Sequence, residues 1–234
     1  FASGGVRFRM NSWFDVQQVG GAFETGLTNR VPVELAYRVR SGSSDPSETR
    51  MYLEAMGTEY VAVHGEKSKE YYRDFRRPDR LSAFPVVYQG EDDAVYALPQ
   101  RPLAHLMTEK EIPPADVLDH PELLRPYVSA IEDASRPLLK VEWKDVSHLV
   151  ISGTVKGGGL ISLQVNAADG WRASQDSINV PLTRDGLGFL VLHPQEGGAI
   201  HLGFRPTWEQ LIFASISALA WVLAIAYAVR SRVK

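Results

Sequence analysis

The sequence contains no cysteine among its 234 residues. This absence excludes disulfide bonds, thiol nucleophiles and cysteine-ligated metal sites within the chain. An excess of charge is also missing, because 25 lysine and arginine residues face 28 aspartate and glutamate residues, for a net charge of −3. A chain without a basic excess lacks the electrostatic footprint of a nucleic-acid-binding protein, so we expect no nucleic-acid partner.

Motifs for metal binding and catalysis are missing as well. The six histidines form neither an HxH nor an HExxH pattern, and no GxSxG nucleophile elbow is present. The closest groups of acidic residues, at positions 91–93 and at positions 116 and 119, fall in a turn and in a proline-rich stretch, and their spacing does not indicate a catalytic pair. We therefore assign no catalytic residue, no metal ligand and no cofactor to this segment.

Charged side chains are absent from one long stretch near the C-terminus, from Leu211 to Val229. At about 1.5 Å per residue, a helix of this length comes close to the roughly 30 Å hydrocarbon core of a bilayer. The alternative, a buried core helix, normally carries a polar stripe. We therefore predict a transmembrane helix over residues 206–230. Aromatic and basic residues flank it, as is typical of a membrane span: Trp208, Tyr227, Arg230, Arg232 and Lys234.

The flanking charges predict an orientation, because positive residues mark the cytoplasmic side of a span. We expect residues 231–234 to form a cytoplasmic tail and residues 1–205 to lie on the extracytoplasmic side. The sequence starts at Phe1, and no basic and apolar signal regions follow. We expect it to be the C-terminal part of a longer membrane protein with earlier spans. A removed signal peptide is the alternative.

Residues 1–108 are expected to form an α/β extracytoplasmic subdomain. The alternation of apolar and polar residues from Val33 to Val39 predicts a half-buried strand. Asp45 and Pro46 then predict the start of a helix that ends at Gly57. Further short apolar runs predict strands at Tyr60–Val63, Pro85–Tyr88, Ala94–Leu98 and Leu103–Met107.

The composition changes twice after this region. Residues 109–138 are rich in proline and acidic residues and are expected to be a helical linker, with its best helix from Pro121 to Asp133. Residues 139–205 contain short apolar runs between Gly, Asp and Pro turns, which is typical of an antiparallel β-sandwich. The predicted fold class is therefore α+β, with one C-terminal transmembrane helix.

Two groups of residues are candidates for ligand contacts. Aromatic rings can stack on a sugar and amides can bond its hydroxyls, which makes five N-terminal residues candidate sugar contacts: Asn11, Trp13, Phe14, Gln17 and Gln18. Simple packing of the two aromatics on the domain is the alternative. A second group consists of arginines that are candidate contacts for an anion or a lipid headgroup: Arg73, Arg76, Arg77 and Arg80. A solvated helix end is the alternative, because Asp74 and Asp79 are interleaved with them.

Three stretches of the C-terminal half follow one another in a recognisable order: Gly158–Ala173, Ile178–Pro194 and Gly197–Pro206. Together with YVAVHG and DAVYALPQRPLAHLM upstream, this order resembles the C-terminal extracytoplasmic region of YfhO-like bacterial membrane proteins, relatives of the GT-C superfamily of polytopic glycosyltransferases. The turn SQDSI departs from the family pattern, because it lacks the glycine that is usual there.

The resemblance implies a location in the bacterial inner membrane and a parent protein that moves sugar from a lipid carrier to a cell-envelope acceptor. The catalytic acids of that family would lie upstream, so none is carried over. The sequence matches a family motif with structural roles at Gly170, Trp171 and Arg172. The resemblance implies that the glycine allows a turn, that the tryptophan anchors one sheet to the other, and that the arginine side chain reaches toward a partner.

The expected function is that of an accessory extracytoplasmic module with the last span of a GT-C-like protein. Its expected partners are membrane lipid, the upstream transmembrane domain of the same protein, and a polyprenyl-linked sugar or an envelope glycan. The alternative is a single-span, membrane-anchored module that binds a glycan or a protein.

Overall fold

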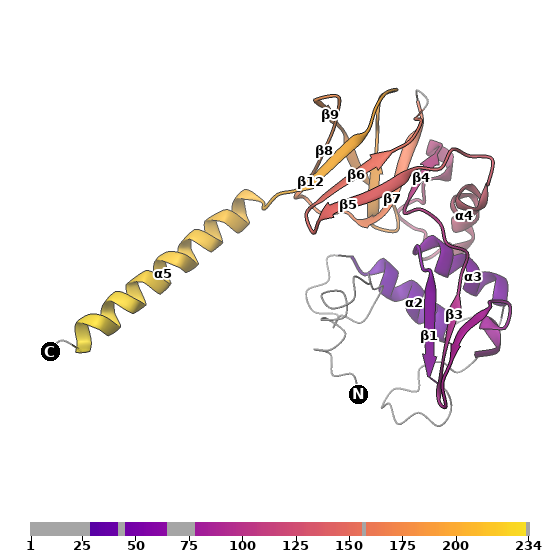
Figure 1. Ribbon diagram of the computed structural model, residues 1–234, viewed down its shortest axis with the longest axis horizontal. Coiled ribbons are helices and arrows are strands. Elements are labelled where there is room, and N and C mark those ends of the chain that lie inside the picture. Colours follow the sequence, from indigo (N-terminus) through magenta and orange to yellow (C-terminus); the bar gives the residue numbers. More distant parts are fainter. Residues whose placement is uncertain (1–28, 42–44, 65–77, 156–157, 233–234) are drawn as a thin grey trace.

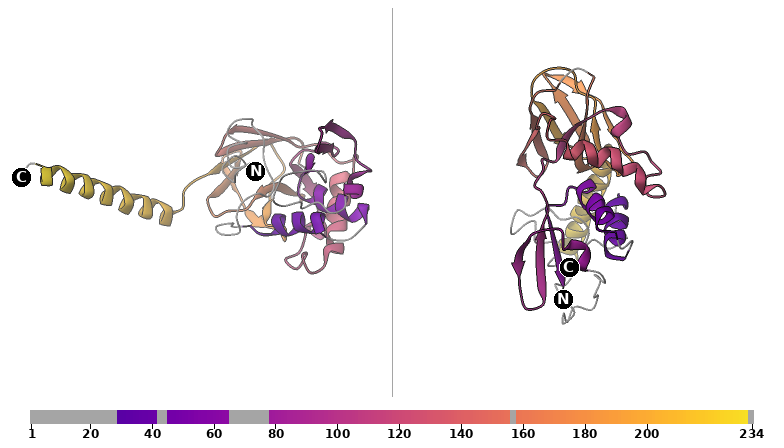
Figure 2. Two further views of the ribbon diagram at one scale, coloured as in Figure 1. Left: turned by 90° about the horizontal axis from the view of Figure 1, so that it is seen from below. Right: turned by 90° about the vertical axis from the view of Figure 1, so that its right-hand side faces the viewer.

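The computed structural model describes residues 29–41, 45–64, 78–155 and 158–232, and this part of the chain is mixed α+β (Figure 1). Helices and a small sheet of the first half lie beside two larger sheets of the second half, and a long C-terminal helix extends away from both (Figure 2). The coarse fold class predicted from the sequence is therefore confirmed.

The first described helix, α2 (Val31–Ser41), occupies the region where the alternation predicted a strand. That prediction was wrong, and the burial of two residues explains why. Leu35 and Val39 are four residues apart, so they share one helical face, and both are buried. Val31 packs against the same cluster. The same apolar residues fit both the two-residue period of a strand and the repeat of a helix. The packing of α2 on α3 favours the helix.

The next helix, α3 (Pro46–Ala55), begins and ends where the sequence predicted. The Asp45 side chain accepts a hydrogen bond from the Ser47 backbone N–H at 2.8 Å, which caps the helix. Pro46 occupies the first turn, and Gly57 follows the helix with a φ of +68°, a conformation that favours glycine.

A three-stranded antiparallel sheet with the order β1-β3-β2 follows α3. Its strands are β1 (Tyr60–His64), β2 (Val86–Gln89) and β3 (Asp93–Ala97). The hairpin between β2 and β3 and the strand β1 agree with the sequence predictions.

A four-stranded antiparallel sheet has the order β10-β11-β7-β4. Its strands are β4 (Ala104–Met107), β7 (Leu160–Asn166), β10 (Leu182–Arg184) and β11 (Phe189–Leu192). β4 precedes the boundary predicted at residue 108, yet it pairs with β7 of the second half of the chain. The two halves therefore share a sheet.

A five-stranded antiparallel sheet has the order β5-β6-β12-β8-β9. Its strands are β5 (Lys140–Asp145), β6 (His148–Ser152), β8 (Trp171–Gln175), β9 (Ile178–Val180) and β12 (Ile200–Phe204). Side chains of this sheet and of the four-stranded sheet belong to one hydrophobic cluster, which includes Ile151, Ile161, Leu163, Leu192 and Ile200.

The turn between β8 and β9 contains no glycine but has a tight hairpin geometry. Gln175 pairs with Ile178, so Asp176 and Ser177 form a two-residue turn. Both have positive φ values, 49° and 68°. Positive φ at both central positions is what a type I′ hairpin turn requires, and aspartate tolerates it better than serine.

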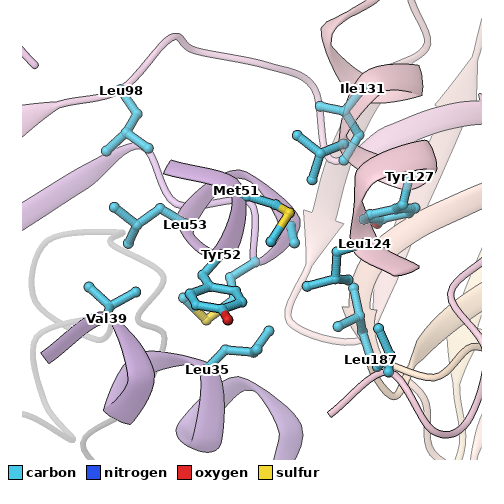
Figure 3. Close-up of a cluster of buried hydrophobic side chains, with 14 of the residues drawn as sticks. Leu35, Val39, Met51, Tyr52, Leu53, Leu98, Leu124, Tyr127, Ile131 and Leu187 are labelled. Atoms are coloured by element: carbon cyan, nitrogen blue, oxygen red, sulfur yellow. The ribbon is translucent and has the colours of Figure 1, made fainter. Parts of the chain in front are cut away.

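Residues 109–138 were predicted as a linker, but much of this segment packs into a second hydrophobic cluster (Figure 3). Its helical elements are 3-10 turns at Glu109–Glu111 and Pro121–Leu124 and the helix α4 (Arg125–Glu132), and the last two lie where the sequence predicted a helix. α4 contacts both α3 and β4. The buried residues that the segment contributes to this cluster are Val117, Leu124, Tyr127, Val128, Ala130 and Ile131.

Arg136 connects the end of this segment to its beginning and to β4 through hydrogen bonds. Its guanidinium makes two hydrogen bonds to the Glu111 carboxylate, at 2.6 and 2.9 Å, and a third at 2.7 Å to the Leu106 carbonyl. The Arg136 hydrogen bonds lower the pKa of Glu111 to about 2. A bidentate pair of this kind fixes geometry as well as charge, so it ties the segment to β4.

The last helix, α5 (Trp208–Arg232), follows β12 after only residues 205–207. Its stretch Trp208–Tyr227 is long and apolar enough to cross a membrane, and none of that stretch is buried against the described part of the chain. Figure 1 and the left-hand view of Figure 2 show α5 projecting away from the other elements.

Candidate functional site

A small pocket lies where α3, α4 and β7 meet, and we call it the junction pocket. It is lined by Glu54, Gly57, Thr58, Glu59, Pro99, Arg101, Ile131 and Gln164. These residues come from four segments that are far apart in the sequence. The pocket lies at the contact between the helices and the four-stranded sheet.

Glu54 is a charged residue in the lining of the junction pocket, and only 5% of it is exposed. One carboxylate oxygen accepts a hydrogen bond at 2.8 Å from Nε of Arg50, which also bonds Glu132 at 2.7 Å. Burial raises the pKa of the Glu54 carboxyl; Arg50 opposes this, whereas the charge of Glu132 adds to it. Glu54 is therefore easier to protonate than an ordinary glutamate.

Gln164 of β7 connects the sheet to the end of α3. Its Nε2 donates hydrogen bonds to the backbone carbonyls of Glu54 at 3.0 Å and of Ala55 at 3.1 Å. The last carbonyls of a helix have no partner within the helix, so Gln164 acts as a cap from a distant strand. A side chain at Gly57 would lie 2.8 Å from Gln164 Oε1, and the φ of +68° at this position favours glycine.

Three buried polar atoms at this site have no hydrogen-bond partner within the described residues: Glu54 Oε2, Thr58 Oγ1 and Arg101 Nε. Unpartnered buried polar atoms are costly, so they mark a place where a small polar group would be stabilised. A hydroxyl or a water can donate to the carboxylate and accept from the arginine at the same time. The enclosed space holds about one water-sized group.

Polar groups continue from the pocket into the interior. The Tyr127 hydroxyl lies 3.0 Å from Ser162 Oγ, and Asp185 accepts a hydrogen bond from the Phe189 N–H at 2.7 Å. Burial lowers the pKa of His105 to about 4 and raises the pKa of Asp185 to about 6. These groups are enclosed by the protein and do not line the pocket. Their positions favour a structural role.

Within the ranges that the structure describes, no group of three or more His, Asp or Glu side chains is placed to hold a metal ion.

The candidate sugar contacts lie outside the described residues, so they stay predictions: Asn11, Trp13, Phe14, Gln17 and Gln18. Three of the four candidate arginines, Arg73, Arg76 and Arg77, also lie outside them. Arg80 is described and only 3% exposed. Its Nη1 donates to the Val39 carbonyl at 3.1 Å. The Arg80 guanidinium is therefore held by the protein itself, and the contact of these arginines with an anion or a lipid headgroup stays a prediction.

The motif Gly170, Trp171 and Arg172 lies at the end of the five-stranded sheet that leads into α5. Trp171 is only 8% exposed, as predicted, and packs edge-on against Trp143 and Phe204, with ring centroids 6.3 and 5.4 Å apart. Trp143 and Phe204 belong to the same five-stranded sheet as Trp171. The role of Trp171 as an anchor between two sheets therefore stays a prediction.

The neighbours of Trp171 shape the turn that precedes it. A side chain at Gly170 would lie 2.4 Å from the Arg205 carbonyl oxygen, so this close approach requires glycine. Nη1 of Arg172 donates to the Asp169 and Trp171 carbonyls, at 2.6 and 2.7 Å. Arg172 is exposed, and it closes the turn through these bonds.

Comparisons of the chain with protein-family models, with curated proteins and with solved structures gave no match.

Proposed function

We propose that the chain is the extracytoplasmic C-terminal module and last membrane span of a polytopic GT-C-like protein. In this proposal it has an accessory role in the transfer of lipid-linked sugar to a cell-envelope acceptor. In this proposal the four- and five-stranded sheets, whose side chains share one hydrophobic cluster, form the β-sandwich, and α2, α3 and the small sheet belong to the N-terminal subdomain. The sugar-transfer part rests on the sequence resemblance.

One observation carries the membrane part of the proposal. The stretch Trp208–Tyr227 of α5 is apolar and packs against no other described element. An apolar helix of this length that is left uncovered is stabilised by a bilayer and not by water. The short connection from β12 to α5 then keeps the sheets close to the membrane surface.

The test is a transfer assay in membranes that contain the parent protein, with and without residues 29–205. The expected result is that the deletion reduces sugar transfer from a polyprenyl-phosphate donor, while binding of the donor is retained. Unchanged transfer would contradict the accessory role. Transfer by the chain alone that disappears in Glu54→Gln would show that the junction pocket is itself catalytic.

A second candidate is a single-span module that binds a glycan or a protein. It is favoured by β2, an end strand of its sheet, in which Val86, Val87 and Tyr88 are exposed. An exposed apolar edge strand is a common place for another chain to pair. A coding sequence upstream of Phe1 that holds only a signal peptide would support this candidate, whereas several apolar segments there would support the first.

A further inference from the structure

Three segments of the chain meet just before α5 begins. The backbone N–H of Phe204 donates to the Ser147 carbonyl at 2.7 Å, which places the β5–β6 turn beside the end of β12. The next N–H, of Arg205, donates to the Gly170 carbonyl at 2.9 Å, which places the turn before β8 there as well. Both turns therefore lie within a few residues of Trp208, the first residue of α5.

The apolar side chains at this place are exposed to an unusual degree. Val146, at the tip of the β5–β6 turn, is 95% exposed, and Trp208 is 68% exposed. The rings behind them, Trp171 and Phe204, pack on one another. A β-branched aliphatic residue at the tip of a turn contributes nothing to the core, and a tryptophan at the start of an apolar helix is typical of a membrane interface.

Exposed cations accompany these apolar residues. Arg172, at the start of β8, and Arg205, directly after β12, are exposed. The Asp145 carboxylate, in contrast, is occupied within its own turn, because it accepts from the Ser147 N–H at 2.7 Å and lies 2.9 Å from His148 Nδ1. Two further carboxylates, Asp169 and Glu209, are exposed nearby. The surface has mixed charge, which suits the phosphates of a lipid surface and does not require a strongly anionic bilayer.

We propose that this surface, which consists of Val146, Arg172, Arg205 and Trp208 and which we call the α5 foot, lies on the bilayer. Val146 and Trp208 enter the interfacial layer, and the two arginines contact lipid phosphates. The inference rests on the proposed function in one respect, that α5 crosses the membrane. It adds that the five-stranded sheet contacts the lipid surface through its turns and does not stand away from it.

Single-cysteine variants test this inference directly, because the native chain has no cysteine to interfere. The full chain is reconstituted in phosphatidylcholine–phosphatidylglycerol nanodiscs, with a bimane label at Val146→Cys. Quenching is measured with lipids that carry a nitroxide on the headgroup. The matched control is Ile178→Cys, which is 52% exposed and follows the turn at the other end of β8.

The expected result is that the label at position 146 is quenched several-fold more strongly than the label at position 178. Equal quenching at the two positions would overturn the inference. Protection of position 146 from both the lipid nitroxide and aqueous iodide would also overturn it, because it would show that a protein segment covers the surface.

A third label separates this inference from the proposed function. Ala218→Cys lies within α5 and reports quenching by nitroxides on the acyl chains. Quenching at 218 without quenching at 146 rejects only the inference, whereas no quenching at 218 rejects the membrane anchor itself.

The arginines are tested in the same preparation. Arg205→Gln in the Val146→Cys background is expected to weaken headgroup quenching at position 146. Lys140→Gln, an exposed cation at the opposite end of β5, is the control and is expected to leave it unchanged. Equal effects of the two substitutions would contradict a contact between Arg205 and lipid phosphate.

Discussion

The junction between the helices and the four-stranded sheet differs from the α5 foot in the kind of contact that holds it together. At the junction, charged and polar side chains connect distant segments, as in Arg50 with Glu54 and Glu132. At the foot, aromatic rings pack behind an exposed surface, and the turns are closed by backbone hydrogen bonds.

The difference shows how each place is expected to respond to its surroundings. Partly buried ion pairs change strength when a carboxylate is protonated, so the junction is expected to be sensitive to pH. The aromatic packing of Trp143, Trp171 and Phe204 involves no titratable group, so it is expected to depend less on pH than the ion pairs of the junction, whereas the exposed apolar residues of the foot are expected to respond to lipid.

The largest expected effect is in the aromatic packing behind the α5 foot. Trp171→Ala removes a large ring that is almost fully buried and should lower the free energy of unfolding by about 3–5 kcal/mol. Trp171→Phe keeps a ring between Trp143 and Phe204 and should lose much less. Urea unfolding followed by circular dichroism at pH 7 measures both. Unfolding of the alanine variant at the wild-type midpoint would show that the ring does not support the sheet.

A smaller effect, which depends on pH, is expected at the junction. Arg136→Gln leaves Glu111 without its cation and should cost about 2–3 kcal/mol at pH 7. Because Arg136 lowers the pKa of Glu111 from 4.5 to about 2, its stabilising contribution is fully present above pH 4.5 and is lost as the pH falls toward 2. Urea unfolding of both proteins between pH 7 and pH 3 should therefore show the difference shrinking with acid.

The control for this prediction is Lys144→Gln, which breaks an exposed ion pair with Glu142. Exposed pairs contribute little, so its effect should be much smaller than that of Arg136→Gln. A penalty for Arg136→Gln that stays constant down to pH 3 would contradict the assignment of the pH dependence to Glu111.

The smallest expected effect is a gain in stability from a change in the β8–β9 turn of the five-stranded sheet. Ser177→Gly relieves a positive φ of 68° in the β8–β9 turn and should stabilise the protein by about 0.5–1 kcal/mol. Ser174→Gly, at a position within β8, is the control and should destabilise, because glycine weakens strands. The two midpoints in urea should move in opposite directions, and a loss of stability in both variants would exclude strain at Ser177.

The sequence predicted the helix α5, the capped start of α3 and many of the strands, because each depends on residues that are close together. Asp45 and Pro46 act within one turn, and the apolar run of α5 needs no partner to be recognised. The strand predicted at Val33–Val39 was wrong because its apolar positions also fit a helix, and only the packing of Leu35 and Val39 on α3 decides between them.

The junction pocket could not be predicted, because its contacts cross long stretches of sequence. Gln164 lies 110 residues from Glu54, whose carbonyl it caps, and Arg50 lies 82 residues from Glu132. Nothing in the local sequence around Glu54 distinguishes it from an exposed helix residue. The burial of Trp171, in contrast, was predicted from a glycine-led turn and a large aromatic at the start of a strand.

The central claim is that α5 crosses a membrane with the sheets on one side and the C-terminal basic residues on the other. Two single-cysteine variants test it in intact cells: Ile178→Cys, and a cysteine inserted after Lys234. The account predicts that a membrane-impermeant maleimide, given access to the outer face of the inner membrane, labels position 178 at once. It should label the inserted cysteine only after the membrane is permeabilised. Ready labelling of both cysteines in intact cells would contradict the claim.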